Sequence, residues 1–206
     1  MANGDLRSTK KVEPTAIQSK MYNNWLAHLT EYPPYESAKF ERETTGSQSN
    51  NTTILNPMVV LRSSFQDAQK KNYTVEKSHA GNSYIHVRLG EKDFFESIQA
   101  IFATEQIPNA TFVQVALFLG VEQDNPEVNP YRELSRLHYQ LLFRPNPPKT
   151  MVVCIKHIVG HIAVLSNPSG VFGVDFETVS VAIIHHLVSP TLRVRRFTMP
   201  LSSCIS

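Results

Sequence analysis

The chain has 206 residues, of which 41% are hydrophobic and 18% charged, and its formal net charge is +2. That length and apolar content suit one domain with a core of its own, with or without a tail. Two cysteines exclude a disulfide framework, no apolar run approaches the roughly 18–20 residues that span a bilayer, and no signal peptide opens the chain. We therefore expect a cytosolic protein, for which membrane contact is possible only from one side.

The charge is unevenly distributed. Residues 57–130 carry six Lys and Arg against nine Asp and Glu, whereas residues 131–206 carry eight against three. The last part of the chain thus has a net charge of +5, which indicates an anionic partner such as nucleic acid or a lipid surface. A soluble basic face with no partner is the alternative.

The first 14 residues are polar and include Lys10 and Lys11, so we expect disorder there. A helical pattern begins at Thr15, because apolar side chains recur at every fourth position. A helix of this length is marginal in water and must dock on something. We expect its own domain to receive it, with a second copy or a membrane surface as alternatives. The expected docking face consists of Met21, Trp25 and Leu29.

Pro33, Pro34 and Tyr35 follow this helix. Paired prolines hold the backbone extended and leave an aromatic ring exposed, a form that docks into aromatic-lined grooves. A rigid turn that ends the helix is the simpler alternative. Residues 41–56 are a polar linker. We therefore place a boundary near Asn56, between an N-terminal arm of residues 1–56 and a single globular domain of residues 57–206.

The segment from Glu91 to Gly120 is interpreted as two short helices joined by a tight turn. Asn109, after Pro108, is expected to cap the second helix. Two helices with one apolar face each need a broad partner, and we expect a β-sheet to provide it. The apolar positions at helical spacing are Phe94, Phe95, Ile98, Ile101 and Phe102, then Phe112, Val115, Ala116 and Leu119.

Strand patterns flank this unit on both sides. Residues 80–82 are expected to form a hairpin turn, Asn129 and Pro130 to start another short helix, and Thr178–Val188 to form a central strand covered on both faces. The expected fold class is α+β: a mostly antiparallel sheet packed against two or three short helices, with a disordered or loosely docked N-terminal arm. The expected strands are residues 58–61, 73–75, 83–89, 139–143, 151–159, 161–166, 178–188 and 191–199.

A search for reactive groups gives no catalytic or metal-binding signature. His157 and His161 are four residues apart but lie in a strand context, and the neighbours His185 and His186 would face opposite sides of a strand. The sequence contains neither a Gly-x-Ser-x-Gly motif nor a glycine-rich phosphate loop. We expect a non-enzymatic protein without a cofactor, and a hydrolase centred on Cys154 and His157 is the least favoured alternative.

Arginines near the C-terminus are the expected basic contact, together with Lys10 and Lys11. Arg193, Arg195 and Arg196 surround Val194 and precede Phe197, so both phosphate contact and base stacking are possible there.

The order of these segments resembles that of rhabdovirus matrix proteins: an arm with scattered basic residues, a proline–tyrosine motif, then a compact α+β domain. The nearest local likeness is the stretch Ala116–Gly120. In that family the folded domain self-associates and bridges the lipid envelope and the nucleocapsid. The resemblance places Pro33, Pro34 and Tyr35 at the late-budding motif. That motif has one residue between the second proline and the tyrosine, and its absence here argues against recruitment of a WW-domain-like host factor.

The sequence therefore suggests a viral matrix-like structural protein that contacts itself, an anionic membrane surface and a nucleocapsid or RNA. It would act in the host cytoplasm, at the membrane periphery and in the virion. The alternative is a nucleic-acid-binding accessory protein, such as a silencing suppressor or a movement-type factor.

Overall fold

The computed structural model describes residues 13–32, 34–35, 39–42, 52–121, 129–131 and 139–184. Strands dominate this part of the chain, with one α-helix and three short 3-10 turns. The elements are β1 (Thr15–Ala16), α1 (Ser19–Glu31), β2 (Phe40–Glu41), β3 (Thr53–Ile54), β4 (Met58–Arg62), β5 (Ser64–Gln66), β6 (Asn72–Thr74), η1 (Ala80–Asn82), β7 (Tyr84–Leu89), β8 (Lys92–Ala103), β9 (Thr111–Leu117), β10 (Leu119–Gly120), β11 (Tyr139–Phe143), β12 (Thr150–Cys154), η5 (Ile155–His157), β13 (Ile158–Asn167), η6 (Val171–Gly173) and β14 (Thr178–Ile183).

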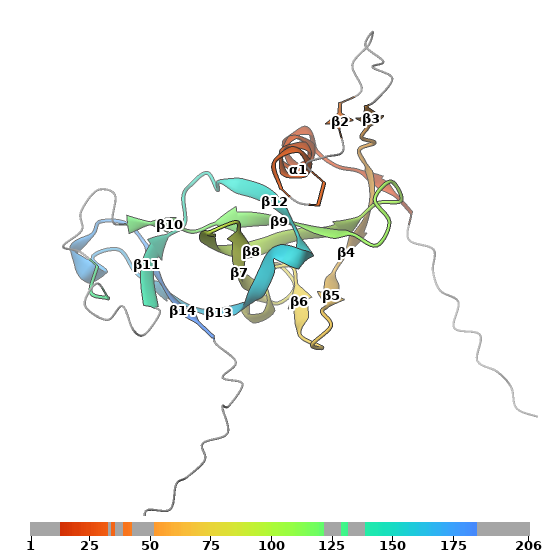
Figure 1. Cartoon of the computed structure of the whole chain (residues 1–206). Helices are drawn as coiled ribbons and strands as arrows, with labels where there is room; N and C mark the ends of the chain where they lie inside the picture. Colours follow the sequence, from red (N-terminus) through yellow and green to blue (C-terminus); the bar gives the residue numbers. More distant parts are fainter. Residues whose placement is uncertain are drawn as a thin grey trace, which may run out of the picture.

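A ten-stranded sheet organises the molecule, and its strands pair antiparallel (Figure 1). The long strand β8 pairs with β4, β7 and β9, and β9 pairs in turn with β12. Strand β13 pairs with β7 through Ile158–His161 and with β14 through Ile162–Asn167. It therefore carries the sheet into a second part, formed by β13, β14, β11 and β10.

The expected mostly antiparallel sheet is confirmed, but the two helices expected between Glu91 and Gly120 are wrong. That segment forms the strands β8 and β9, and Asn109 lies in the turn between them with φ of 66°. The apparent helical spacing arises because both faces of β8 are covered. Phe94 and Ile98 belong to one hydrophobic cluster, whereas Phe95 belongs to another on the opposite face. A register shift between Ile98 and Ala100 then displaces the alternation.

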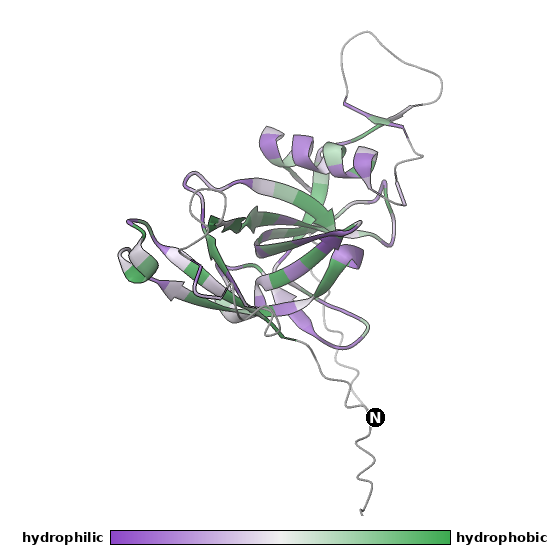
Figure 2. Cartoon of the chain, turned by 60° about the vertical axis from the view of Figure 1, so that its left-hand side comes forward, coloured by the Kyte–Doolittle hydropathy of each residue, from purple (hydrophilic) through white to green (hydrophobic). Residues whose placement is uncertain are grey.

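Helix α1 lies over β9 and β12 (Figure 1) and begins at Ser19 rather than at Thr15, because Thr15 pairs with Val59 of β4. The side chains of Trp25 and Leu29 are fully buried against the sheet. The Trp25 ring meets Phe102 edge-on at 5.4 Å between centroids. In Figure 2 this helix alternates hydrophilic and hydrophobic residues, as expected of a helix with one face in the core.

The helix also covers the outer edge of β12. The Asn24 amide donates to the Thr150 carbonyl at 3.0 Å, and the Cys154 N–H donates to Nε2 of His28 at 3.1 Å. An uncovered edge strand presents unpaired backbone groups that recruit other chains.

One hydrophobic cluster contains residues from both sides of Asn56, where the sequence suggested a domain boundary. Its members are Met21, Tyr22, Trp25, Leu29, Leu55, Val59, Phe102, Ile107, Ala110, Phe112, Val152 and Cys154.

Two further hydrophobic clusters lie among the described residues. The second lies on the opposite face of β8, where the hairpin β5–β6 contributes Phe65 and Tyr73. The third lies under the second part of the sheet and consists of Phe95, Phe118, Leu142, Ile162, Val179 and Val181. This third cluster joins the two parts of the sheet.

Several strand predictions agree with the structure. The strands expected at 58–61, 83–89 and 139–143 correspond to β4, β7 and β11. The central strand expected at Thr178–Val188 corresponds to β14, which lies between β13 and β11 but ends at Ile183, and residues 185–188 lie outside the described residues. The hairpin turn expected at residues 80–82 is instead the 3-10 turn η1, because β6 pairs with β5 and not with β7. The helix expected after Pro130 and the strand at 191–199 lie outside the described residues.

Candidate functional site

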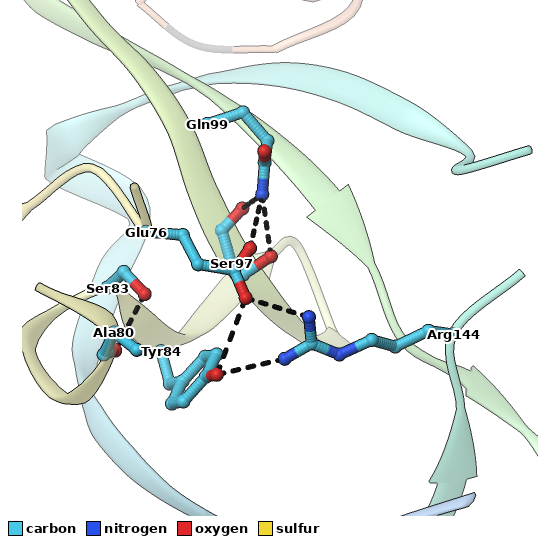
Figure 3. Close-up of polar contacts among 7 residues, drawn as sticks. All are labelled: Glu76, Ala80, Ser83, Tyr84, Ser97, Gln99 and Arg144. Atoms are coloured by element: carbon cyan, nitrogen blue, oxygen red, sulfur yellow. Dashed lines mark hydrogen bonds and ion pairs between the residues drawn. The ribbon is translucent and has the colours of Figure 1, made fainter. Parts of the chain in front are cut away.

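Arg144, directly after β11, ties the second part of the sheet to the first (Figure 3). Its Nη1 donates to Oε1 of Glu76 at 2.7 Å, and its Nη2 donates to the Tyr84 hydroxyl at 3.0 Å. The guanidinium also lies over the rings of Tyr84 and Phe118, at 5.4 and 5.0 Å from their centroids. The Arg144 head group is therefore fixed by contacts on several sides.

Glu76 receives donors from both parts of the sheet. Nε2 of Gln99 donates to its Oε2 at 2.7 Å, beside the Arg144 bond to Oε1. Partial burial acts to raise the pKa of Glu76, but hydrogen bonds from Gln99 and Arg144 outweigh it and hold that pKa below its usual value. The pair is a structural tie with matched charges.

A cavity of about 510 Å³ opens beside this tie. Its lining is mainly apolar, and the rings of Phe143 and Phe176 meet edge-to-face at 5.7 Å between centroids. Glu177 is exposed at the cavity, and with the other described residues it forms neither a hydrogen bond nor an ion pair. A pocket with a few polar groups in an apolar wall is the usual form of a small-ligand site. The lining residues are Val121, Phe143, Arg144, Pro145, Asn146, Val174, Phe176 and Glu177.

Glu96 is the second unusual group. It lies in β8 between Ile85 of β7 and Leu117 of β9, its side chain is completely buried, and neither carboxyl oxygen has a hydrogen-bond partner in the described part of the chain. Burial raises the pKa of Glu96 to about 8. A buried carboxyl group without a hydrogen-bond partner among the described residues lowers the stability of the folded chain.

The hypothesis of a hydrolase centred on Cys154 and His157 does not fit the geometry. The Cys154 side chain is fully buried, which leaves no route for a substrate to its sulfur. Its hydrogen-bonding neighbour is the Tyr35 hydroxyl, and burial followed by that contact raises the pKa of Tyr35 to about 12. The His157 ring instead packs edge-on against His28 at 5.3 Å.

Metal binding by the histidines gains no support either. The His161 ring stacks on Tyr73 of β6, with 4.3 Å between centroids. The His157 ring instead contacts His28 of α1, so the two histidines have neighbours on different elements. Within the described residues there is no group of three or more His, Cys, Asp or Glu that could hold a metal ion. His185 and His186 lie outside the described residues.

The other residues singled out from the sequence divide into two sets. Met21, Trp25 and Leu29 are brought together in the cluster under α1. Tyr35 packs against the Phe112 ring at 5.9 Å, so it is partly buried rather than presented as a free motif. Pro34 is exposed in the turn after α1. Pro33, Lys10, Lys11, Arg193, Arg195 and Arg196 lie outside the described residues.

The residues of the cavity were not found by sequence reasoning. Phe143 and Phe176 are distant in the chain, and they meet because β11 and β14 pair with Phe143 opposite Thr178. The available signal was limited to an aromatic beside a charged residue at Phe143–Arg144 and at Phe176–Glu177. Such pairs are too common to indicate a site.

No protein-family model, curated protein or solved structure matches this chain. Among the described residues no helix has the length and apolar character needed to cross a membrane. Function must therefore be inferred from the geometry and charge of the chain itself.

Proposed function

We propose that this protein is a non-enzymatic, matrix-like structural protein that self-associates and bridges a membrane surface and a nucleocapsid. The observation that supports self-association is an apolar outer face on the second part of the sheet. Tyr139 lies opposite Ala182, and Ala182 lies opposite Ala163. Leu165 lies two residues after Ala163, and Ile184 lies two residues after Ala182. The two side chains are 66% and 48% exposed.

This outer face is distinct from the core-facing side of the same strands. Alternate residues such as Ile162 and Val181 are buried in the third cluster. On the outer side, the Tyr131 hydroxyl donates to Ser180 Oγ at 2.9 Å and covers only part of the face. Contiguous exposed apolar surface commonly marks an interaction site.

A second copy of the chain is the partner that fits this face best. The exposed residues Tyr139, Ala163, Leu165 and Ile184 include no charged group. An anionic lipid surface or a nucleic acid would select a basic face. An uncharged face is instead complementary to itself, as the two-fold interface of a homodimer requires.

Self-association can be tested by sedimentation velocity over a concentration series. Leu165→Asp places a charge on the face and should shift the protein to monomer. Leu61→Asp is the matched control, because Leu61 is also a leucine on a strand and is 46% exposed, but lies on β4. A wild-type chain that stays monomeric at high concentration contradicts the proposal, as does equal dissociation by both variants.

The bridging role is supported by the net charge of +5 in residues 131–206. It can be tested by co-sedimentation with anionic vesicles and with single-stranded RNA across a salt series. Replacing Arg193, Arg195 and Arg196 with serine should weaken vesicle binding. Serine at the exposed Arg62, Lys77 and Lys92 gives the same charge change as a control. Binding to RNA alone favours the accessory-protein alternative, and binding to neither partner contradicts bridging.

A further inference from the structure

Among the described residues that line the cavity beside Arg144, one ionised group is not already engaged. The guanidinium of Arg144 is bound to Glu76 and Tyr84 and stacked on Phe118. Its positive charge is matched by the Glu76 carboxylate at 2.7 Å. Glu177 has no such partner among the described residues, so the described part of the lining carries an unbalanced negative charge.

The aromatic residues of the lining also favour a positively charged ligand. Phe143 and Phe176 both line the cavity, and their rings cross at 63° rather than stack face to face. A ring face is the negative end of the aromatic quadrupole and attracts a cation, by about 0.5–2 kcal/mol depending on desolvation. Val121, Pro145 and Val174 supply the remaining apolar wall.

We propose that this cavity binds an organic cation, an ammonium group that carries apolar substituents. The methyl groups of such a cation would meet the apolar wall and the Phe rings, and its charge would lie beside Glu177. An anionic ligand would have to take Arg144 from Glu76 and leave that carboxylate partly buried without its cation. A neutral apolar ligand would gain nothing from Glu177.

Two ligands of the same shape separate charge recognition from simple apolar binding. Choline and its neutral isostere 3,3-dimethylbutan-1-ol differ in one atom, nitrogen in place of carbon, and in the charge. Titration at constant ionic strength, followed by the NMR shifts of the protein, should show choline binding about tenfold more tightly. Equal affinity for the two ligands overturns the proposal, as does the absence of binding by either.

Variants of the full chain test the assigned residues. Glu177→Gln should reduce the preference for choline without abolishing it, because the aromatic rings still attract the cation. Phe176→Leu should also reduce this preference while the apolar volume is largely kept. Asp175→Asn is the control, because Asp175 is an exposed carboxylate two residues away that does not line the cavity. If Asp175→Asn lowers the preference as much as Glu177→Gln does, general surface charge explains it and the site is wrong.

The same cation occurs in a lipid headgroup and in a methylated lysine side chain. Vesicles of neutral phosphatidylcholine and a peptide with trimethyl-lysine distinguish these sources, with an unmethylated peptide as control. Loss of vesicle binding in Glu177→Gln assigns the lipid, and loss of peptide binding assigns a protein partner. Leu165 is not part of the cavity. If the cavity does not bind the cation, the sedimentation test of self-association with Leu165→Asp therefore keeps its meaning.

Discussion

Two of the regions that bury titratable side chains differ in the hydrogen-bond partners they provide: the region under α1 provides them, and strand β8 provides none for Glu96 among the described residues. Under α1, His28 Nε2 accepts the Cys154 N–H at 3.1 Å, and the Tyr22 hydroxyl donates to the Leu55 carbonyl at 2.7 Å. Among the described residues, the groups there without a hydrogen-bond partner include Nε1 of Trp25 and Nδ1 of His28, whose side chains carry no charge at neutral pH. In β8, by contrast, neither oxygen of the Glu96 carboxyl has a partner in the described part of the chain.

The two regions respond to pH in opposite directions. Burial, with a smaller effect of His157, lowers the pKa of His28 from 6.5 to about 4. Burial raises the pKa of Glu96 from 4.5 to about 8. The unfolded chain binds an extra proton at His28 between pH 4 and 6.5, so stability rises with pH there. The folded chain holds an extra proton at Glu96 between pH 4.5 and 8, so stability falls as pH rises.

The opposing slopes cancel between pH 4.5 and 6.5. Each group contributes a slope of about 1.4 kcal/mol per pH unit in its own window. Between pH 6.5 and 8 the contribution of His28 no longer changes and that of Glu96 still does, so Glu96 should make the wild-type free energy of unfolding fall there with rising pH. A free energy of unfolding that does not change with pH can therefore result from two buried groups whose unfavourable contributions change with pH in opposite directions.

The largest expected effect is removal of the α1 anchor. Trp25→Ala leaves a cavity between Phe102 and Phe112 and should lower the free energy of unfolding by about 3–5 kcal/mol. Urea denaturation measures the change. Asn23→Ala, on the exposed side of the same helix, should change stability by less than about 0.5 kcal/mol. Similar losses in both variants would mean that helix propensity, and not docking, determines the contribution of α1.

Glu96→Leu should stabilise the protein by roughly 2–3 kcal/mol near pH 7.5, because the folded state no longer has to take up a proton. Thermal unfolding as a function of pH should show that the decline between pH 6.5 and 8 has disappeared. The variant should also reveal the rising slope of His28 below pH 6.5. A variant that keeps the wild-type decline above pH 6.5 would contradict this account.

His28→Gln keeps an acceptor for the Cys154 N–H but does not titrate. It should be about 1–2 kcal/mol more stable than the wild type near pH 5 and equally stable near pH 7.5. His28→Leu removes the acceptor and should be less stable by about 1–3 kcal/mol near pH 7.5. Equal losses in the two variants at that pH would show that ring packing against Tyr32 and His157, rather than the hydrogen bond, is important.

The smallest effect is expected at the partly exposed tie between Glu76 and Arg144. Glu76→Gln should lower the free energy of unfolding by less than about 1 kcal/mol, because solvent screens the pair. The difference should shrink as salt is added. A large loss of stability that does not depend on salt would show that the pair of Glu76 and Arg144 behaves like a fully buried ion pair.

The sequence allowed the antiparallel sheet and several of its strands to be predicted, because each carries a local β pattern. It also indicated which side of α1 is apolar, since Met21, Trp25 and Leu29 repeat every fourth residue. It failed for β8, where burial of both faces and the shift at Ile98 imitate a helix. It gave no indication that Glu96 is buried, because a strand of mixed polarity does not reveal what its neighbours cover.

The cavity was equally hidden from sequence reasoning. Phe143, Phe176 and Glu177 meet through the register of two strands, and register depends on the whole sheet rather than on any short segment. Pairing of Arg144 with Glu76 joins residues separated by 68 positions. Contacts at that distance leave no local periodicity that a sequence pattern can show.

The cover that α1 provides for β12 has a consequence for biosynthesis. His28 and the Cys154 backbone are 126 residues apart. At a usual elongation rate of about 5–20 residues per second, the ribosome delivers the partner strand roughly 6–25 s after the helix. Until β12 is made, Trp25 and Leu29 lack part of the native surface that covers them, so the nascent helix is a natural client for a holding chaperone.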